Sequence, residues 1–187
     1  MSLDWTTLSD GELATLSLAG RQSAFSELMR RHERAVFRLT RGCIGDADEA
    51  LDLTQETFVA AHRALAHYDG TRPMRTWLSA IALNKCRDWS RKRKVRRFLS
   101  FAVPIGAEAE AVVDSQVAVD DATSDRQELD RVRRAIADLP DALKEPLVLH
   151  TIEGLSQAET AAVLAISEKA VETRLYRARQ KLAVSLA

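Results

Sequence analysis

Three polar side chains, Asp52, Gln55 and Glu56, form a cluster in the sequence DLTQETF, within an alanine-rich segment that otherwise has the pattern of a packed helix. Residues three and four apart share one face of a helix. Paired carboxylates could serve acid–base catalysis, but no His, Ser or Cys stands close by to complete a catalytic set. Two acids and an amide suit the Arg side chains and backbone donors of another protein. The cluster indicates a docking face, with a solvated helix face as the alternative.

A basic stripe follows further along the chain. Asn84, Arg87, Arg91 and Lys94 are spaced so that they share one helix face, and residues 85–97 hold eight bases against a single acid. Cations can hold phosphates without reading sequence, whereas Asn can hydrogen-bond a base edge. The stripe therefore indicates nucleic-acid binding. A solvated basic tail is the alternative for SRKRKVRR alone, and the helical pattern that leads into it argues against that.

The C-terminal part has the pattern of a helix-turn-helix. Ser156 and Glu159 have the spacing of a capping box, and Ser167 can cap a second helix after a short turn. The outer face of that second helix carries Lys169, Glu172, Thr173, Tyr176 and Arg177. Such a face can enter a DNA groove. The alternative is a helical hairpin that binds nothing, and the coincidence of caps, turn length and a basic outer face favours DNA binding.

Composition favours an all-α protein. Of 187 residues, 46% are hydrophobic and 5% aromatic, and Gly and Pro are scarce. No run of about 18 apolar residues exists, and the N-terminal residues lack a signal-peptide pattern, so we expect a cytoplasmic protein without a membrane span. Cys43 and Cys86 lack CxxC spacing and read as small buried side chains. The spacing of the two cysteines therefore predicts no disulfide framework. The four histidines lack the spacing of metal ligands, so no metal site or cofactor is predicted.

Helical periodicity runs through both halves of the chain. The expected helices begin after Ser9, cover 24–42, run from Asp46 or Asp48 to about His67, and then cover 75–97, 129–139, 142–154, 156–166 and 168–182. We expect Gly42 and Gly45 to end the second helix, and Asp141 to cap the helix at 142–154. Leu51, Phe58 and Leu65 recur every seven residues and should mark the buried face of the third helix. Trp77 and Trp89 should pack in the core rather than stack on bases.

The charge distribution predicts two domains. Basic and acidic residues balance at 27 each, but residues 106–125 hold six acids and no base. A structureless loop of that length is uncommon inside one compact unit, so we interpret it as a flexible linker rather than a solvated loop of one domain. The predicted organisation is an N-terminal tail or short helix at 1–18, a helical domain at 19–97, an acidic linker at 98–125 and a second helical domain at 126–187.

Four stretches, taken in order, resemble the signatures of the extracytoplasmic-function (ECF) sigma factors, group IV of the sigma-70-type family of bacterial RNA polymerase. They are DLTQETF, WLSAIALNKCRDWSRKRK, IADLPDALKEPLVLHTIEGLSQAETAAVLAIS and RLYRARQKL. The resemblance covers roughly residues 22–186 and leaves the linker unconstrained. It implies that residues 19–97 are sigma region 2 and that residues 126–187 are sigma region 4.

The resemblance also implies roles for individual residues. Asp52, Gln55 and Glu56 would contact the clamp helices of the largest polymerase subunits. The minus-ten promoter element would be bound by Asn84, Arg87, Arg91 and Lys94, and by Tyr68 in a loop at 68–76 that receives a flipped base. The minus-thirty-five element would be bound by Lys169, Thr173, Arg174 and Arg177. Glu172 departs from the family pattern, in which a basic residue is frequent at this position. Thr160 stands where a larger aliphatic residue is usual.

These observations predict a sigma factor that docks on core RNA polymerase, recognises promoter DNA and helps to open it, without catalysing a reaction. The resemblance implies an anti-sigma factor as a further partner. A stand-alone helix-turn-helix transcriptional regulator would explain the C-terminal half but leave Asp52, Gln55 and Asn84 without a role. An enzyme with paired carboxylates would lack a pocket signature and a proton-transfer partner.

Overall fold

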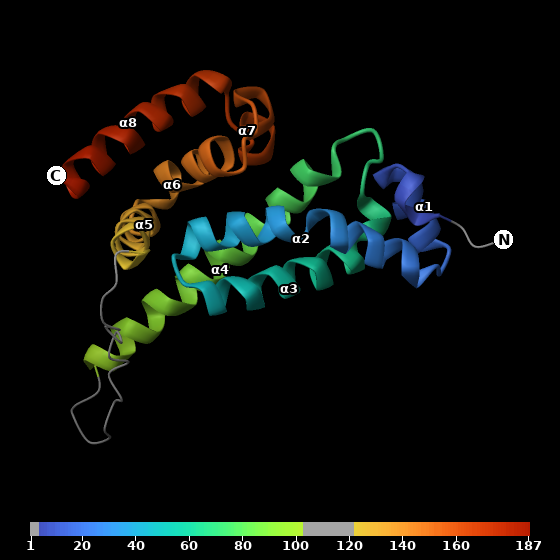
Figure 1. The fold of residues 1–187 in the computed structure, drawn as a ribbon, viewed down its shortest axis with the longest axis horizontal. Helices are drawn as coiled ribbons and strands as arrows, with labels where there is room; N and C mark the ends of the chain where they lie inside the picture. Colours follow the sequence, from blue (N-terminus) through green and yellow to red (C-terminus); the bar gives the residue numbers. More distant parts are fainter. Residues whose placement is uncertain (1–3, 103–121) are drawn as a thin grey trace.

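The computed structural model describes residues 4–102 and 122–187, and no β-strand occurs in these two ranges. The first range contains η1 (Trp5–Thr7), α1 (Asp10–Leu18), α2 (Gln22–Ile44), α3 (Ala47–Ala64), η2 (Leu65–His67) and α4 (Met74–Ala102). The second contains α5 (Ala122–Ala137), α6 (Asp141–Leu147), the π-helical turn η3 (Val148–Ile152), α7 (Gln157–Leu164) and α8 (Glu168–Leu186). The predicted all-α fold is confirmed (Figure 1). Most of the predicted linker, 103–121, lies outside the described residues.

Helices α1 to α4 form an N-terminal bundle. Its core contains Leu28 and Leu39 from α2, Phe58 from α3 and Leu83 from α4, each at most 3% exposed. Burying one such side chain contributes about 1.5–3 kcal/mol. Cys43 and Cys86 are free thiols buried in the same core, as predicted. The bundle is thus a conventional apolar core that fixes the outer faces of α3 and α4.

The buried face of α3 differs from the prediction at one position. Phe58 and Leu65 are buried, but Leu51 is 47% exposed. Two threonines lie in the core instead, because their hydroxyls find partners: Thr54 donates to the Ala50 carbonyl at 2.7 Å, and its oxygen lies 3.1 Å from that of Thr40. Hydrogen-bonded hydroxyls remove most of the cost of burial. The apolar heptad therefore marked the edge of the buried face rather than its centre.

Two further local expectations need correction. Gly42 does not end α2, which continues to Ile44; only Gly45, with φ +84°, forms the left-handed C-cap. Asp141 does not cap α6, because Pro140 occupies the N-cap and Asp141 is the first helical residue, where it pairs with Lys144 at 3.2 Å. Gly42 is not a cap because α2 continues two residues beyond it, and Asp141 is not a cap because Pro140 occupies the N-cap position.

The N-terminal segment is held by Arg31 of α2. Its guanidinium donates to the carbonyls of Trp5, Thr6 and Leu8 at 2.8–3.0 Å. It also donates to Glu27 at 2.8 Å. The capping box predicted from Ser9 and Glu12 is present at the start of α1. One partly buried guanidinium thus binds three carbonyls of the N-terminal segment to the bundle.

Helices α5 to α8 with η3 form the C-terminal unit. Val171, Leu175 and Ala178 of α8 are buried, as predicted, and Leu182 is half-buried. Gly154, with φ +67°, closes the turn before α7, whose N-cap Ser156 forms the predicted capping box with Glu159. Ser167 caps α8 through the Ala170 amide. The helix-turn-helix geometry therefore follows from local signals that the sequence displays.

The two units pack against each other. Helix α7 lies over α4, and η3 lies against α2 (Figure 1). Val148, Leu149 and Leu155 of the C-terminal unit are buried in the same apolar core as the N-terminal bundle. Gly42 permits this approach, because a Cβ placed there would lie 3.0 Å from the Ile152 Cδ1 and 3.1 Å from the Val148 Cγ1. Within the two described ranges, no helix is long and apolar enough to cross a membrane.

Candidate functional site

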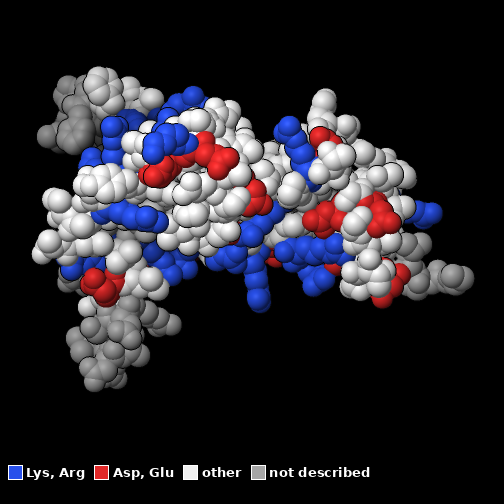
Figure 2. All heavy atoms as spheres, turned by 90° about the horizontal axis from the view of Figure 1, so that it is seen from above, with Lys and Arg blue, Asp and Glu red and all other residues white. Residues whose placement is uncertain are grey.

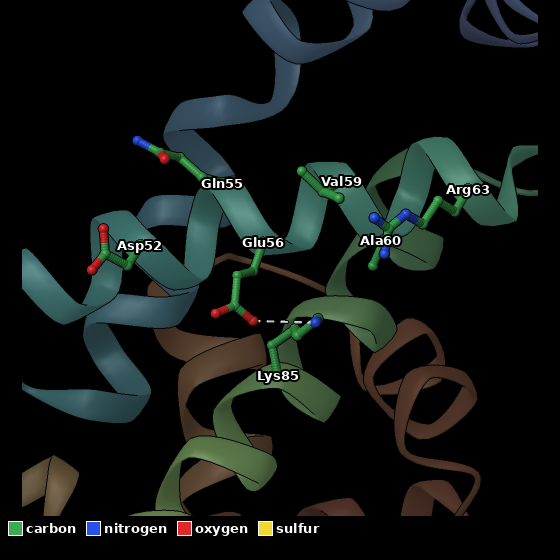
Figure 3. A pocket seen from close by; sticks show the side chains of 7 residues that line it. All are labelled: Asp52, Gln55, Glu56, Val59, Ala60, Arg63 and Lys85. Atoms are coloured by element: carbon green, nitrogen blue, oxygen red, sulfur yellow. Dashed lines mark hydrogen bonds and ion pairs between the residues drawn. The ribbon is translucent and has the colours of Figure 1, made fainter.

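The polar cluster of α3 lines an open hollow of about 550 Å³ on the surface of the bundle (Figure 3). Its lining consists of Asp52, Gln55, Glu56, Val59, Ala60 and Arg63 of α3 with Lys85 of α4. All three predicted docking residues are exposed. Their helix turns its opposite face into the core through Leu53, Thr57 and Phe58. The structure therefore brings the predicted cluster together on one outward face.

The three residues of the cluster differ in their partners. Glu56 pairs with Lys85 at 3.2 Å across the gap between α3 and α4. Among the described residues, Asp52 and Gln55 make no hydrogen bond, and Figure 3 shows both side chains pointing away from the bundle. Val59, which is 51% exposed, places an apolar side chain beside them. An apolar contact flanked by unpaired polar groups has the composition of a protein–protein contact surface.

The basic stripe of α4 lies partly at the contact between the two units. Arg87 donates two hydrogen bonds of 2.6 Å each to the Glu145 carboxylate of α6, and a third of 3.1 Å to the Asn84 oxygen. The hydrogen bond to Glu145 raises the pKa of the Arg87 guanidinium. Arg91 pairs with Asp88, and Lys94 is exposed. The stripe therefore occupies one helix face, on which Arg87 is bound to α6 whereas Arg91 and Lys94 are exposed to solvent.

The predicted loop before α4 is closed by its own hydrogen bonds. The Tyr68 hydroxyl donates to the Arg72 carbonyl at 2.5 Å, and its ring lies 5.1 Å from that of Trp77. Burial raises the pKa of the Tyr68 hydroxyl. Trp77 and Trp89 are half-buried against the bundle core, as predicted, and Trp89 donates to Glu49 at 2.6 Å. The loop thus presents one half-buried aromatic ring at its base.

The predicted DNA-reading face of α8 is exposed. Lys169, Thr173 and Arg177 lie on the surface, and Arg174 is half-buried. Glu172 pairs with Lys169 at 2.8 Å, while the Thr173 hydroxyl donates to the Lys169 carbonyl. The departure at Glu172 therefore neutralises a neighbouring cation of the same face. Figure 2 shows Lys and Arg side chains spread over one face of the molecule, with acidic groups between them.

A second cluster of charged residues, formed by Arg38, Arg75 and Glu153, was not predicted from the sequence. The Glu153 side chain is 1% exposed and accepts hydrogen bonds from Arg38 at 3.1 and 3.2 Å and from Arg75 at 3.1 Å. Arg75 also donates to the Glu153 carbonyl. These residues are 78 and 115 positions apart, so no local pattern relates them. The one available signal was Glu153 at the end of a helix with an otherwise apolar inner face.

Comparison with known proteins gives a consistent result. The family model described as "Sigma-70 region 2" matches residues 28–105, and the one described as "Sigma-70, region 4" matches residues 129–182. The chain is 41% identical to the RNA polymerase sigma factor CnrH of Cupriavidus metallidurans, over 95% of this chain and 94% of that protein. It is 31% identical to the ECF RNA polymerase sigma factor SigM of Mycobacterium tuberculosis, over 94% and 83% of the two chains.

A solved structure shows a similar fold. The structure of CnrH in complex with the cytosolic domain of CnrY matches with a TM-score of 0.69 and 36% identity. The match covers 94% of this chain and 95% of that one. Both halves of the chain, and their order, are therefore shared with a protein of known fold.

Proposed function

Because the chain belongs to the extracytoplasmic-function sigma factors of bacterial RNA polymerase, we propose that it directs core polymerase to specific promoters and promotes DNA opening at initiation. The observation that carries this proposal is the outward face of α3, where Asp52 and Gln55 have no partner among the described residues. Such unpaired groups offer acceptors to Arg and backbone donors of a large protein partner. A sigma factor supplies binding rather than catalysis, and the proposed role needs no cofactor.

Each surface has a role within this proposal. Residues 19–97 act as region 2 and residues 126–187 as region 4, joined by the acidic segment 98–125. Asp52, Gln55 and Glu56 dock on core polymerase. Asn84, Arg87, Arg91 and Lys94, with the ring of Tyr68, hold the non-template strand of the minus-ten element, because cations neutralise phosphates while an amide or a ring engages a base. Lys169, Thr173, Arg174 and Arg177 contact the minus-thirty-five element in the major groove.

An anti-sigma factor is the proposed regulator. Support comes from the solved relative CnrH, which is bound to the cytosolic domain of CnrY. A partner that covers the α3 face would prevent docking on polymerase, since both would need the same unpaired groups. The proposed role places the protein in the cytoplasm, where promoter DNA and polymerase are found.

A stand-alone regulator explains less of the molecule. It would use α7 and α8 alone, leaving the hollow at Asp52 and the match of residues 28–105 without a role. Transcription by reconstituted polymerase separates the two functions. Core polymerase freed of its own sigma factors, mixed with this protein, should start transcripts at a fixed position on DNA from the protein's own operon. No transcript, together with tight duplex binding by the isolated protein, would indicate the stand-alone regulator.

A further inference from the structure

The loop between η2 and α4, residues 68–73, is closed by hydrogen bonds within itself. The Asp69 carboxylate accepts from the amide and the hydroxyl of Thr71 at 3.0 and 2.7 Å, and these bonds lower the pKa of Asp69. The Arg72 amide donates to the Asp69 carbonyl at 2.9 Å, and the Tyr68 hydroxyl donates to the Arg72 carbonyl. The loop therefore holds its own shape, but none of these bonds fixes its position on the bundle.

A contact with α1 fixes that position. Gly11, in the first turn of α1, lies against Gly70 of the loop, and a Cβ built on Gly11 would lie 3.6 Å from the Gly70 carbonyl oxygen. Neither glycine has a positive φ, so the missing side chains serve close approach rather than a left-handed turn. Figure 1 shows the loop beside α1. The backbones of the two segments thus meet without a side chain between them.

Asp10 attaches the same turn of α1 to α2. Its carboxylate accepts a hydrogen bond from Arg31 at 3.1 Å and lies 2.7 Å from Nε2 of His32. The His32 side chain is 14% exposed and that of Asp10 is 28% exposed, so salt screens these contacts less than fully exposed ones. Asp10 directly precedes Gly11 in the chain. The residue that touches the loop is therefore held in place by its neighbour.

Asp10 also acts on Tyr68 through its charge. Burial is the main cause that raises the pKa of the Tyr68 hydroxyl, and the negative charges of Asp10 and Asp69 raise it further. The Tyr68 ring lies 5.1 Å from that of Trp77 in the first turn of α4, measured between ring centroids. The first turn of α1 thus influences the loop at two places, at Gly70 by contact and at Tyr68 by charge.

We propose that Asp10 and Gly11 form a brace that positions the loop and, with it, the base that the loop receives. This inference rests on the proposed function, which gives the loop its role at the minus-ten element. Taking a base out of its stack has a cost that contacts in the pocket must offset, and a loop that is already in place loses less freedom on binding. Asp10, Gly11 and His32 are positioning residues, because they act through the loop.

Two sets of variants loosen the brace. Gly11→Ile adds branches to a Cβ that already contacts Gly70, while Ile is favoured over Gly within a helix. Gly11→Ala is the matched control, because its Cβ alone lies at an ordinary contact distance. His32→Ala removes one partner of Asp10. His32→Gln is the rescue, because its amide nitrogen restores a donor for the Asp10 carboxylate.

A cross-link tests the contact in the free full-length protein. A Cβ on either glycine would lie 4.0 Å from the Cα of the other, which is compatible with disulfide geometry. Gly11→Cys with Gly70→Cys should therefore form a disulfide on treatment with diamide, identified by peptide mass spectrometry. The original chain is the control, because its Cys43 and Cys86 are buried.

Base preference is measured with core polymerase. Barcoded templates carry the promoter of the protein's own operon, randomised at the minus-ten or the minus-thirty-five element, and the transcribed barcodes are sequenced. Because a specifically read base pair gives roughly a five- to 150-fold preference, Gly11→Ile and His32→Ala should lower the preference at the flipped base at least about threefold. Preference at all other positions, and affinity for core polymerase, should not change. Gly11→Ala, His32→Gln and the oxidised double-cysteine variant should keep the original preference.

The outcomes separate the possible failures. Absence of the disulfide would show that α1 and the loop do not meet. An equal loss at every promoter position, or a loss explained by a lower melting temperature, would reduce the brace to a structural contact. Loss of preference in the oxidised variant would show that the loop must leave α1 to receive the base. If the original chain gives no transcript, the proposed function fails together with the role of the brace at DNA, whereas a disulfide would still show that α1 contacts the loop.

Discussion

Lys85 of α4 reaches across to Glu56 of α3 and pairs with it at 3.2 Å, so that one of the three predicted docking residues is neutralised within the molecule. The Glu56 side chain is 58% exposed, which makes the pair a surface ion pair worth at most about 1 kcal/mol to stability. The ion pair matters more for the net charge of the α3 face than for the free energy of unfolding. Without Lys85, the α3 face would present a second uncompensated carboxylate beside Asp52.

Lys85→Met should therefore strengthen docking. If polymerase offers cations to this face, we expect the dissociation constant for core polymerase to fall about threefold to tenfold at low salt, and the gain to shrink at high salt because charges are screened. Lys92→Met removes one exposed cation from the same helix and serves as the control. Equal effects of both changes would show that only the net charge of the protein matters, and weaker binding by Lys85→Met would show that Lys85 itself contacts the polymerase.

The ion pairs of Glu27 should give the fold an acid-sensitive component. Hydrogen bonds from Arg30 at 2.7 Å and from Arg31 at 2.8 Å lower the pKa of Glu27 from 4.5 to about 2. A folded-state pKa below the unfolded value stabilises the protein above the unfolded pKa, and that stabilisation is lost as the pH falls through the folded pKa.

Glu27→Gln should accordingly be less stable than the original chain at neutral pH. The difference in unfolding free energy, measured with urea, should be constant above about pH 4.5 and should shrink steadily between pH 4.5 and pH 2. Glu33→Gln, an exposed acid on the same helix, should show no such difference. If the difference in unfolding free energy between Glu27→Gln and the original chain does not depend on pH, packing rather than charge stabilises this part of α2.

Glu172 should weaken contact with the minus-thirty-five element. It pairs with Lys169 at 2.8 Å and adds a negative charge to the face that we propose contacts DNA phosphates. With polymerase bound, Glu172→Gln should tighten binding to promoter duplex several-fold and steepen the salt dependence by about one phosphate contact. The control is Glu128→Gln on α5. Loss of preference for the promoter over random duplex would instead assign Glu172 a role in reading cytosine.

Local signals determined much of this structure, and contacts distant in sequence determined the rest. Ser9, Ser156 and Ser167 are recognisable as caps because their partners are only three residues away, and the exposed face of Asp52 and Gln55 follows from helical spacing alone. The burial of Thr54 was not predictable, since it depends on a hydroxyl of Thr40 in another helix.

The contact between the two units could not be predicted from the sequence. Gly42 looks like a helix end in the sequence, whereas in the structure it is the place where η3 approaches α2. Likewise Arg87 belongs to a stripe by its spacing, but its engagement with Glu145 depends on the way that the two units meet. Such a contact leaves no periodic pattern and no local motif in the sequence.

Affinity for core polymerase tests the central claim most directly. The variant Asp52→Ala with Gln55→Ala removes the two unpaired groups of the α3 face, and Gln127→Ala with Glu128→Ala removes an exposed amide and acid from α5 as the matched control. Because each hydrogen bond to a charged group is worth roughly 1.5–3 kcal/mol, we expect the α3 variant to bind core at least about tenfold more weakly at an unchanged melting temperature, with the control unaffected. Unchanged core affinity in the α3 variant, or a loss explained by a lower melting temperature, would contradict the account.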